Sequence, residues 1–189
     1  MSRDIDVDES AWVAPSAQLY GRISIAAESS VWHNAVLRAE CMEIRIGRMT
    51  NIQDFVMVHV GYDDATVIGD FCSITHHATV HGCRIGDHCL VGIGAVVMEG
   101  AEIGAGSIVA GGAVVPAGKV FGPGSIVAGV PAKQIAERDS ARANRMNAWL
   151  YHRNSQLTRN GELRAWEGAE FEQWRAAKQA EVDSDRDLP

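Results

Sequence analysis

Residues 85–115 read IGDHCLVGIGAVVMEGAEIGAGSIVAGGAVV, and this stretch decides the fold. An aliphatic side chain recurs at every sixth position, and glycine or alanine follows it in most repeats. The recurring positions are Ile85, Val91, Val97, Ile103, Val109 and Val115. A period of six fits neither the 3.6-residue turn of an α-helix nor the two-residue alternation of an amphipathic strand. It is typical of a parallel β-helix, in which each hexapeptide forms one side of a triangular coil.

The same ladder extends toward the N-terminus. Its earlier positions are Val13, Leu19, Ile25, Val31, Leu37, Ile46, Ile52, Val58, Ile68, Ile74 and Val80. We expect these side chains to point inward and to stack coil upon coil into a narrow core. The spacing widens after Leu37 and after Val58, which predicts two excursions from the coil. The second excursion, 60–65, contains the glycine and the aspartates of a surface turn.

Small residues in the second slot of the repeat predict tight corners. The positions are Gly69, Gly86, Gly92, Gly104 and Ala110. A bulky side chain is expected to clash there, and positive φ angles are expected.

The pattern changes after Lys133, so we predict a β-helix domain over 1–133 and a helical extension over 134–189. Asp139 and Ser140 are suited to cap a helix that runs to about Gln156, and Asn160 is suited to cap a second helix. The chain has 189 residues, which is enough for one domain with a sizeable core.

Charge and composition argue against several classes of function. The formal net charge of −7 argues against a nucleic-acid partner. No apolar stretch reaches membrane-spanning length, and the polar, acidic N-terminus does not resemble a signal peptide. The four cysteines form no CxxC pair and are expected to be reduced. We therefore predict a cytoplasmic protein with neither a nucleic-acid nor a membrane partner.

Three histidines stand in matched places on the ladder. His59 follows Val58 and His81 follows Val80, so both occupy the same slot. The separation of Val58 and Val80 equals one coil of eighteen residues plus the four extra residues of the excursion, because 58 + 18 + 4 = 80. His59 and His81 should therefore stack on one edge, about 4.8 Å apart. His76 belongs to the preceding side of the triangle and should reach that edge only from a second subunit.

This geometry predicts a metal site between subunits, most simply in a closed homotrimer. Three neutral imidazoles leave a fourth position for water, which is the arrangement of catalytic zinc sites. Zinc lowers the pKa of its bound water to about 7, so hydroxide becomes available to attack carbon dioxide. The alternative is that the histidines are ordinary surface residues of a β-helix corner.

Three segments carry a family resemblance. Asn51-Ile52-Gln53-Asp54, Val58-His59-Val60 and the segment from His76 to Cys83 resemble the signature of γ-class carbonic anhydrases, over about residues 10 to 135. The resemblance implies a homotrimeric left-handed parallel β-helix of hexapeptide repeats with C-terminal α-helices. It also implies that His59, His76 and His81 bind zinc, or iron or cobalt, and that the substrates are carbon dioxide and bicarbonate.

The resemblance assigns further residues. Gln53 is expected to hydrogen-bond the metal-bound solvent or bicarbonate, and Arg38 and Asp54 to form a charged pair joining subunits. Glu40 stands where the family usually has aspartate, so it keeps the charge on a longer arm. Tyr151, on the first C-terminal helix, is expected to reach over a neighbouring site. The alternative for Arg38 and Asp54 is a solvated surface pair.

The chain departs from the best-characterised active type of the family at its proton-transfer groups. Cys41 replaces a glutamate, and the short loop after His59 offers only Asp63 and Asp64. We therefore expect weak or buffer-dependent hydration activity, with His77 as a candidate replacement shuttle.

Two other functions remain open. Many hexapeptide proteins are acyltransferases or CoA-ester enzymes that use one histidine as a general base. The third alternative is a metal-binding trimer without catalytic activity.

Overall fold

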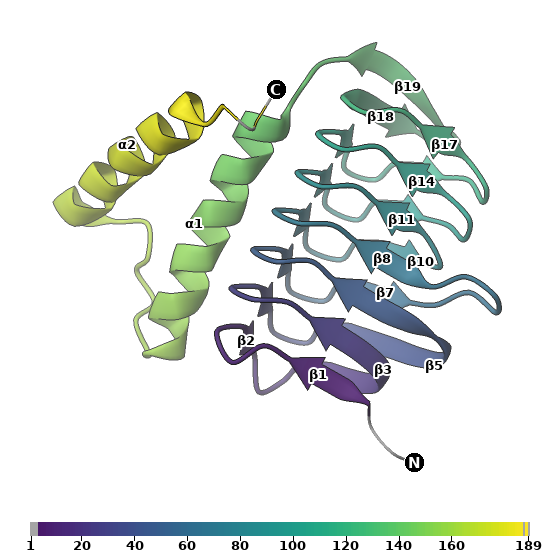
Figure 1. Cartoon of the computed structure of the whole chain (residues 1–189), viewed down its shortest axis with the longest axis horizontal. Coiled ribbons are helices and arrows are strands. Elements are labelled where there is room, and N and C mark those ends of the chain that lie inside the picture. The colour runs from purple at the N-terminus through teal and green to yellow at the C-terminus, as the bar shows by residue number, and fades with distance from the viewer. Residues whose placement is uncertain (1–3, 187, 189) are drawn as a thin grey trace.

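The computed structural model describes residues 4–186 and 188, and it is built on a parallel β-helix (Figure 1). One sheet has eight strands, in the order β2 (Trp12–Val13), β4 (Ser30–Val31), β6 (Asn51–Ile52), β9 (Ser73–Ile74), β12 (Leu90–Val91), β15 (Ile108–Val109), β18 (Ser125–Gly129) and β19 (Ala132–Glu137). Strand β19 returns antiparallel to β18, so the other seven strands mark one coil each.

A second sheet forms the other two sides of the triangle. Its eleven strands are β1 (Ile5–Val7), β3 (Gln18–Ile25), β5 (Val36–Ile46), β7 (Met57–His59), β8 (Thr66–Ile68), β10 (Thr79–His81), β11 (Arg84–Ile85), β13 (Val96–Val97), β14 (Glu102–Ile103), β16 (Val114–Val115) and β17 (Val120–Phe121). Strand β5 pairs with β7 through its first half and with β8 through its second half. It therefore bends through one corner and links the two sides. We call the side with β7, β10, β13 and β16 the second face.

The predicted ladder is the core. Its positions from Ile25 onward are buried, whereas Val13 and Leu19 in the first coil are partly buried, and successive coils pair at these positions. The ladder continues beyond the predicted positions to Phe121 and Val127, which are also buried. The prediction of a parallel β-helix of hexapeptide repeats with C-terminal helices is confirmed.

The second-slot glycines are required by close packing between coils, and the predicted positive φ angles are wrong for this slot. A Cβ atom on Gly92 would lie 2.5 Å from the backbone nitrogen of Gly111, in the next coil. Positive φ angles instead occur two residues later, at His77, His88 and Gly94 for example. The coil therefore turns at that later position.

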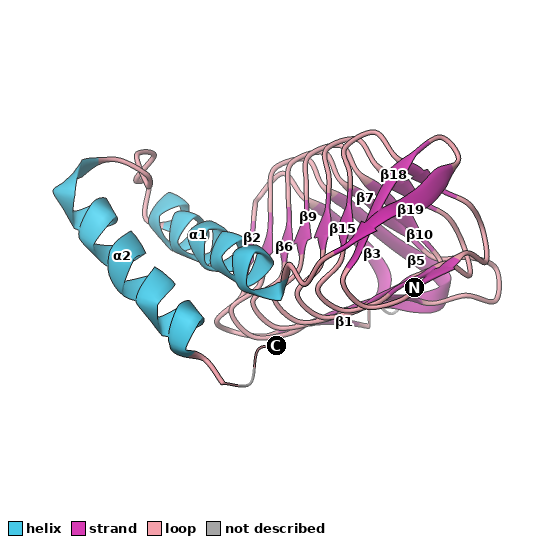
Figure 2. Ribbon diagram, turned by 90° about the horizontal axis from the view of Figure 1, so that it is seen from above, coloured by secondary structure: helices cyan, strands magenta, loops and turns pink. Residues whose placement is uncertain are grey.

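Two helices follow the β-helix. Helix α1 (Ala141–Arg159) lies beside the coils and contacts β2, β4, β6 and β9, whereas α2 (Gly168–Ser184) packs on the outer side of α1 (Figures 1 and 2). Asn144 and Asn147 fix α1 in place. The Asn144 side chain donates to the carbonyl of His88 at 2.8 Å, and the Asn147 Oδ1 accepts from Ser73 Oγ at 2.8 Å. In the described part of the chain, no helix combines the length and apolar character needed to cross a membrane.

The predicted first helix is confirmed with a slightly later end, but the predicted start of the second helix is wrong. Asn160 ends α1, with its backbone N–H on the carbonyls of Leu157 and Thr158. Gly161 follows with a φ of +83°, which breaks the helix. The chain then crosses to Gly168 before α2 begins, so Trp166 lies in the connection. The division into domains at residue 133 stays a prediction.

Candidate metal centre

The corner after the second face brings His59 and His81 together. The two residues are direct partners in the parallel pairing of β7 and β10, as predicted, and their ring centroids are 5.0 Å apart. Both follow a fully buried valine, so the strand alternation turns their side chains outward. Arg38 is the next member of this column, because it pairs with His59 across β5 and β7.

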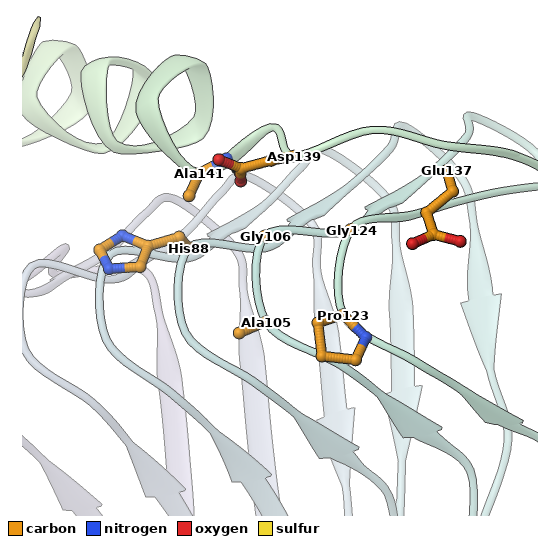
Figure 3. Close-up of a pocket in the computed structure, with 8 residues that line it drawn as sticks. All are labelled: His88, Ala105, Gly106, Pro123, Gly124, Glu137, Asp139 and Ala141. Atoms are coloured by element: carbon orange, nitrogen blue, oxygen red, sulfur yellow. Dashed lines mark hydrogen bonds between the residues drawn. The ribbon is translucent and has the colours of Figure 1, made fainter. Parts of the chain in front are cut away.

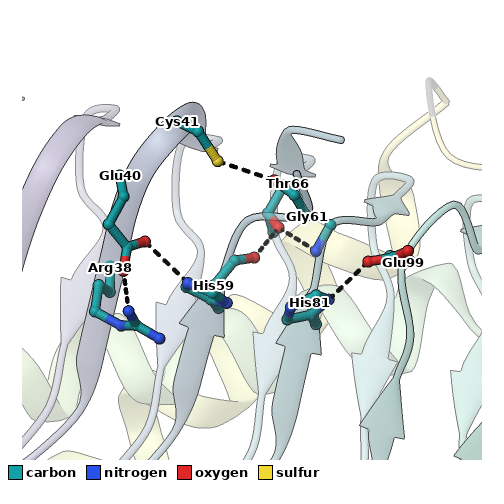
Figure 4. Close-up of polar contacts among 9 residues, drawn as sticks. Arg38, Glu40, Cys41, His59, Gly61, Thr66, His81 and Glu99 are labelled. Atoms are coloured by element: carbon teal, nitrogen blue, oxygen red, sulfur yellow. Dashed lines mark hydrogen bonds and ion pairs between the residues drawn. The ribbon is translucent and has the colours of Figure 1, made fainter. Parts of the chain in front are cut away.

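Charged side chains surround this pair (Figure 4). Glu40 contacts both Arg38 and the Nε2 of His59, the latter at 2.9 Å. Glu99, from the following coil, has its Oε2 3.7 Å from the Nδ1 of His81. Burial and the nearby Arg38 charge lower the pKa of His59, which favours the neutral imidazole that a metal ion requires. We call these five residues the His59/His81 corner.

His76 lies at the opposite end of the second face, in the turn between β9 and β10. Asp54 is its neighbour in the previous coil, and the Asp54 Oδ2 lies 3.1 Å from the His76 Nδ1. The Tyr151 hydroxyl reaches the other ring nitrogen, Nε2, at 3.4 Å. Tyr151 therefore approaches a predicted ligand of its own chain. We call Gln53, Asp54, His76 and Tyr151 the His76 corner.

Aromatic packing holds Tyr151 in place. Its ring meets Trp32 edge to face at 5.7 Å and Trp166 at 5.8 Å. Burial, with a smaller contribution from the Asp54 charge, raises the pKa of Tyr151, so the hydroxyl stays protonated and can donate a hydrogen bond.

Gln53 is buried at this corner. Its Nε2 donates to the Asn51 Oδ1 at 2.9 Å, while its Oε1 is buried without a hydrogen-bond partner among the described residues. The unpartnered oxygen can accept a hydrogen bond, and the role of Gln53 toward metal-bound solvent stays a prediction.

The two corners remain separate within one chain. Among residues 4–186 and 188, no group of three or more His, Cys, Asp or Glu side chains gathers closely enough to hold a metal ion. The donor set nevertheless fits a metal, because His59 and His81 present two imidazoles on one corner, with ring centroids 5.0 Å apart and ring planes tilted by 49°. A third imidazole has to come from outside the corner.

Other sulfur and imidazole groups are not part of these corners. Cys72, Cys83 and Cys89 are buried, and the exposed Cys41 places its thiol 3.3 Å from the Gly61 carbonyl. Burial raises the pKa of Cys83 to about 12, which makes it a core residue rather than a ligand. The exposed His77 stacks on Phe55 with ring centroids 5.0 Å apart.

A separate pocket of about 270 Å³ lies near the start of α1 (Figure 3). Its lining residues are His88, Ala105, Gly106, Pro123, Gly124, Glu137, Asp139 and Ala141. The Nδ1 of His88 is buried without a hydrogen-bond partner among the described residues, and burial together with Arg145 lowers the pKa of His88.

Sequence reasoning missed Glu99. Glu99 lies eighteen residues after His81, because 81 + 18 = 99, and this separation is one full coil. The coil spacing alone could have identified Glu99, although the hexapeptide repeat marks only the aliphatic position Val97 in this part of the chain.

Comparisons with known sequences identify relatives of this chain. The family described as bacterial transferase hexapeptide (six repeats) matches residues 82–117. γ Carbonic anhydrase 1 of Arabidopsis thaliana, a mitochondrial protein, is 41% identical over 100 residues, which cover 50% of this chain and 36% of that protein. A probable carbonic anhydrase of Methanocaldococcus jannaschii is 46% identical over 85 residues, which cover 45% of this chain and 54% of that protein. The chain thus spans between about a third and a half of these curated relatives.

Solved structures match over more of the chain. A Bacillus cereus protein whose proposed activity is acetyl transfer has a TM-score of 0.80 at 28% identity, covering 84% of this chain and 93% of that one. A hexapeptide transferase family protein of Anaplasma phagocytophilum has a TM-score of 0.77 at 34% identity, covering 80% of this chain and 91% of that one. Over about half of its length the chain is similar to γ carbonic anhydrases, and on the coverage and identity of the solved relative it belongs to the hexapeptide-repeat family.

Proposed function

We propose that this protein is a γ-carbonic-anhydrase-like metalloprotein that interconverts carbon dioxide and bicarbonate at sites shared between the subunits of a homotrimer. One observation carries the proposal. His59 and His81 stack at 5.0 Å on one corner, while His76 stands at the other end of the same face. A neighbouring subunit that presents its His76 corner to the His59/His81 corner completes a three-imidazole site.

The second face between the two corners supports the subunit arrangement. Its outward side chains pair coil to coil along the face. They are Val36, Met57, Thr79, Val96 and Val114. All five are only partly buried in the single chain. A second copy covering this strip buries apolar surface and brings the two kinds of corner together, whereas a strip left in water does neither.

The histidines are the proposed ligands of zinc, with iron or cobalt as alternatives. When bound, the metal supplies Lewis acidity and makes a water nucleophilic near neutral pH. The role of the protein is to hold His59, His76 and His81 oriented toward the metal.

The remaining residues have proposed positioning roles. Asp54 holds His76 through its Nδ1, and the Tyr151 hydroxyl lies 3.4 Å from its Nε2. The unpartnered Oε1 of Gln53 accepts a hydrogen bond from solvent or bicarbonate. Arg38 is engaged by Glu40 in the single chain, and we propose that it turns to Asp54 of a neighbouring subunit on assembly.

Carbon dioxide is small and uncharged, so its capture requires only a limited apolar surface beside the metal. The proton released by hydration also requires a route to solvent. The loop 60–65 supplies only Asp63 and Asp64, and Cys41 lies where an acidic group would help. We therefore propose a modest turnover that external buffer accelerates.

Metal analysis combined with stopped-flow carbon dioxide hydration tests this function, on protein purified without chelators. The expected results are close to one divalent metal per chain and a rate that rises with imidazole buffer concentration. His81→Ala is the control and should lose both metal and activity. Folded protein that stays metal-free after exposure to zinc, iron and cobalt would contradict the proposal. Metal binding without hydration at any buffer concentration would instead support the non-catalytic trimer.

An acyltransferase is the second candidate, and the pocket beside His88 is the observation that favours it. A neutral imidazole can serve as the general base of acyl transfer, and two solved relatives are named as transferase-type proteins. The pocket of about 270 Å³ is small for a CoA thioester, since ligand pockets usually measure about 300–1,000 Å³. Acetyl-CoA binding measured by calorimetry, with His88→Ala as control, separates this candidate from the first.

A further inference from the structure

We propose that Glu99 is the positioning residue of His81: its carboxylate holds the Nδ1–H of the imidazole and thereby directs Nε2 toward the metal. This inference rests on the proposed function, because it assigns an outer partner to a proposed ligand. The starting observation is that the Nδ1 of His81 is buried and has no hydrogen-bond partner among the described residues.

A buried polar atom without a hydrogen-bond partner lowers the stability of the folded state, so a partner is expected nearby. The Oε2 of Glu99 lies 3.7 Å away, which is an ion-pair distance just beyond a hydrogen bond (Figure 4). A neutral imidazole that binds a metal through Nε2 must carry its proton on Nδ1. The bound state thus turns Nδ1 into an obligatory donor, and Glu99 needs to move by less than about 1 Å to accept from it.

The backbone around Glu99 is fixed, and space for its side chain is kept open. The neighbouring Gly100 donates its N–H to the Gly82 carbonyl at 2.7 Å, and the Glu99 carbonyl accepts from Gly118 at 2.8 Å. A Cβ atom on Gly82 would lie 3.1 Å from the Cβ of Glu99, and one on Gly61 would lie 3.3 Å from its Oε2. Two glycines therefore border the Glu99 side chain where larger residues would crowd it.

Each of the other two proposed ligands also has a carboxylate from a neighbouring coil beside its ring, on Nδ1 in His76 and on Nε2 in His59. Asp54 lies 3.1 Å from the Nδ1 of His76, and Glu40 lies 2.9 Å from the Nε2 of His59. Glu99 approaches His81 through Nδ1, as Asp54 approaches His76. Carboxylates in this position usually orient a ligating imidazole and increase its basicity.

The competing interpretation is an ordinary surface ion pair, because the Glu99 side chain is 51% exposed. A surface pair contributes little to stability and nothing to metal affinity. Metal affinity therefore separates the two interpretations, and it can be measured without any turnover assay.

The test is Co²⁺ binding to the full-length protein, followed by its visible absorption and by competition with a chromophoric chelator. We expect Glu99→Gln to weaken Co²⁺ binding about tenfold and Glu99→Ala to weaken it further, toward about a hundredfold. Glu99→Asp keeps the charge on a shorter side chain, so its Co²⁺ affinity should lie between those of the wild type and Glu99→Gln. The exposed Glu102 on β14 provides the matched control, and Glu102→Gln should bind Co²⁺ as wild type does. The melting temperature of the metal-free protein should be unchanged in all of these variants.

Co²⁺ affinities of Glu99→Gln and Glu99→Ala within twofold of wild type would overturn the inference while leaving the proposed function intact. Equal losses in Glu99→Gln and Glu102→Gln would overturn it as well, because a general charge effect would then explain them. Wild-type protein that takes up no Co²⁺, or a His81→Ala variant that binds it normally, would instead contradict the proposed function itself.

Discussion

His59 and His81 are direct partners across the parallel strands β7 and β10, and their ring centroids lie 5.0 Å apart. The inward pairing of Val58 with Val80 sets this register. A shift by one residue would turn both valines to solvent and both histidines into the core, so burial of the valines also positions the imidazoles.

Subunit mixing tests whether the metal site is shared. His76→Ala and His81→Ala homotrimers should each lose tight metal binding, because each lacks one imidazole at every site. Co-refolded mixtures should regain part of it, since some interfaces then pair an intact His59/His81 corner with an intact His76. Metal content after gel filtration is the measurement. No recovery at any mixing ratio would place all ligands within one chain.

Met57→Arg should disrupt the assembly. Met57 lies between Val36 and Thr79 in the outward strip on the second face, where a buried, unpaired guanidinium is strongly unfavourable. We expect sedimentation equilibrium to shift from the mass of three chains toward that of one, with loss of metal. Glu102→Arg, which adds a cation on the face of β14, is the control and should remain assembled. A trimeric Met57→Arg variant would show that the second face is not the interface.

Gly92→Ala should destabilise the β-helix more than Gly112→Ala. A Cβ on Gly92 would meet the Gly111 nitrogen at 2.5 Å, whereas one on Gly112 meets nothing within 4 Å. Overpacking in Gly92→Ala should lower the free energy of unfolding by about 3 kcal/mol or more. An alanine at the positive φ of +68° in Gly112→Ala should lower it by about 1–2 kcal/mol. Urea unfolding gives both free energies, and equal losses would refute the packing explanation.

His88 should make the stability of the metal-free protein depend on pH. Burial, reinforced by the Arg145 charge, lowers the pKa of His88 in the folded state. The unfolded chain then binds the extra proton more readily, so stability is complete above the ordinary histidine pKa of about 6.5 and falls as pH decreases below it. The difference in unfolding free energy between pH 7.5 and pH 5 should be smaller in His88→Gln, measured with EDTA. Identical pH slopes would show that His88 does not contribute.

Residue counting predicted the parts of the fold and of the site that depend on a repeat. The 22-residue separation of Val58 and Val80 was enough to place His59 opposite His81, because one coil and one loop account for it. The contacts of Glu99 could not be counted in this way. The coil length places Glu99 one coil after His81. The direction of its flexible side chain, however, depends on the space that Gly61 and Gly82 leave open.

The second helix shows where local signals compete. Asn160 is a favourable residue at either end of a helix, and the sequence pattern predicts that a second helix starts there. The following Gly161, with its left-handed φ, makes it an end instead. The predicted pairing of Arg38 with Asp54 across subunits depends on a second chain, which no pattern within one sequence determines.

Both excursions from the coil leave it at the corner that carries Arg38 and His59, one within β5 and the other over 60–65. Residues 62–64 of the second excursion are exposed and carry none of the buried ladder. Insertions or deletions there change what covers the histidines without altering the stack of coils beneath. Evolution can therefore adjust access and proton exchange at this corner by loop length alone, while the stability of the scaffold is selected separately.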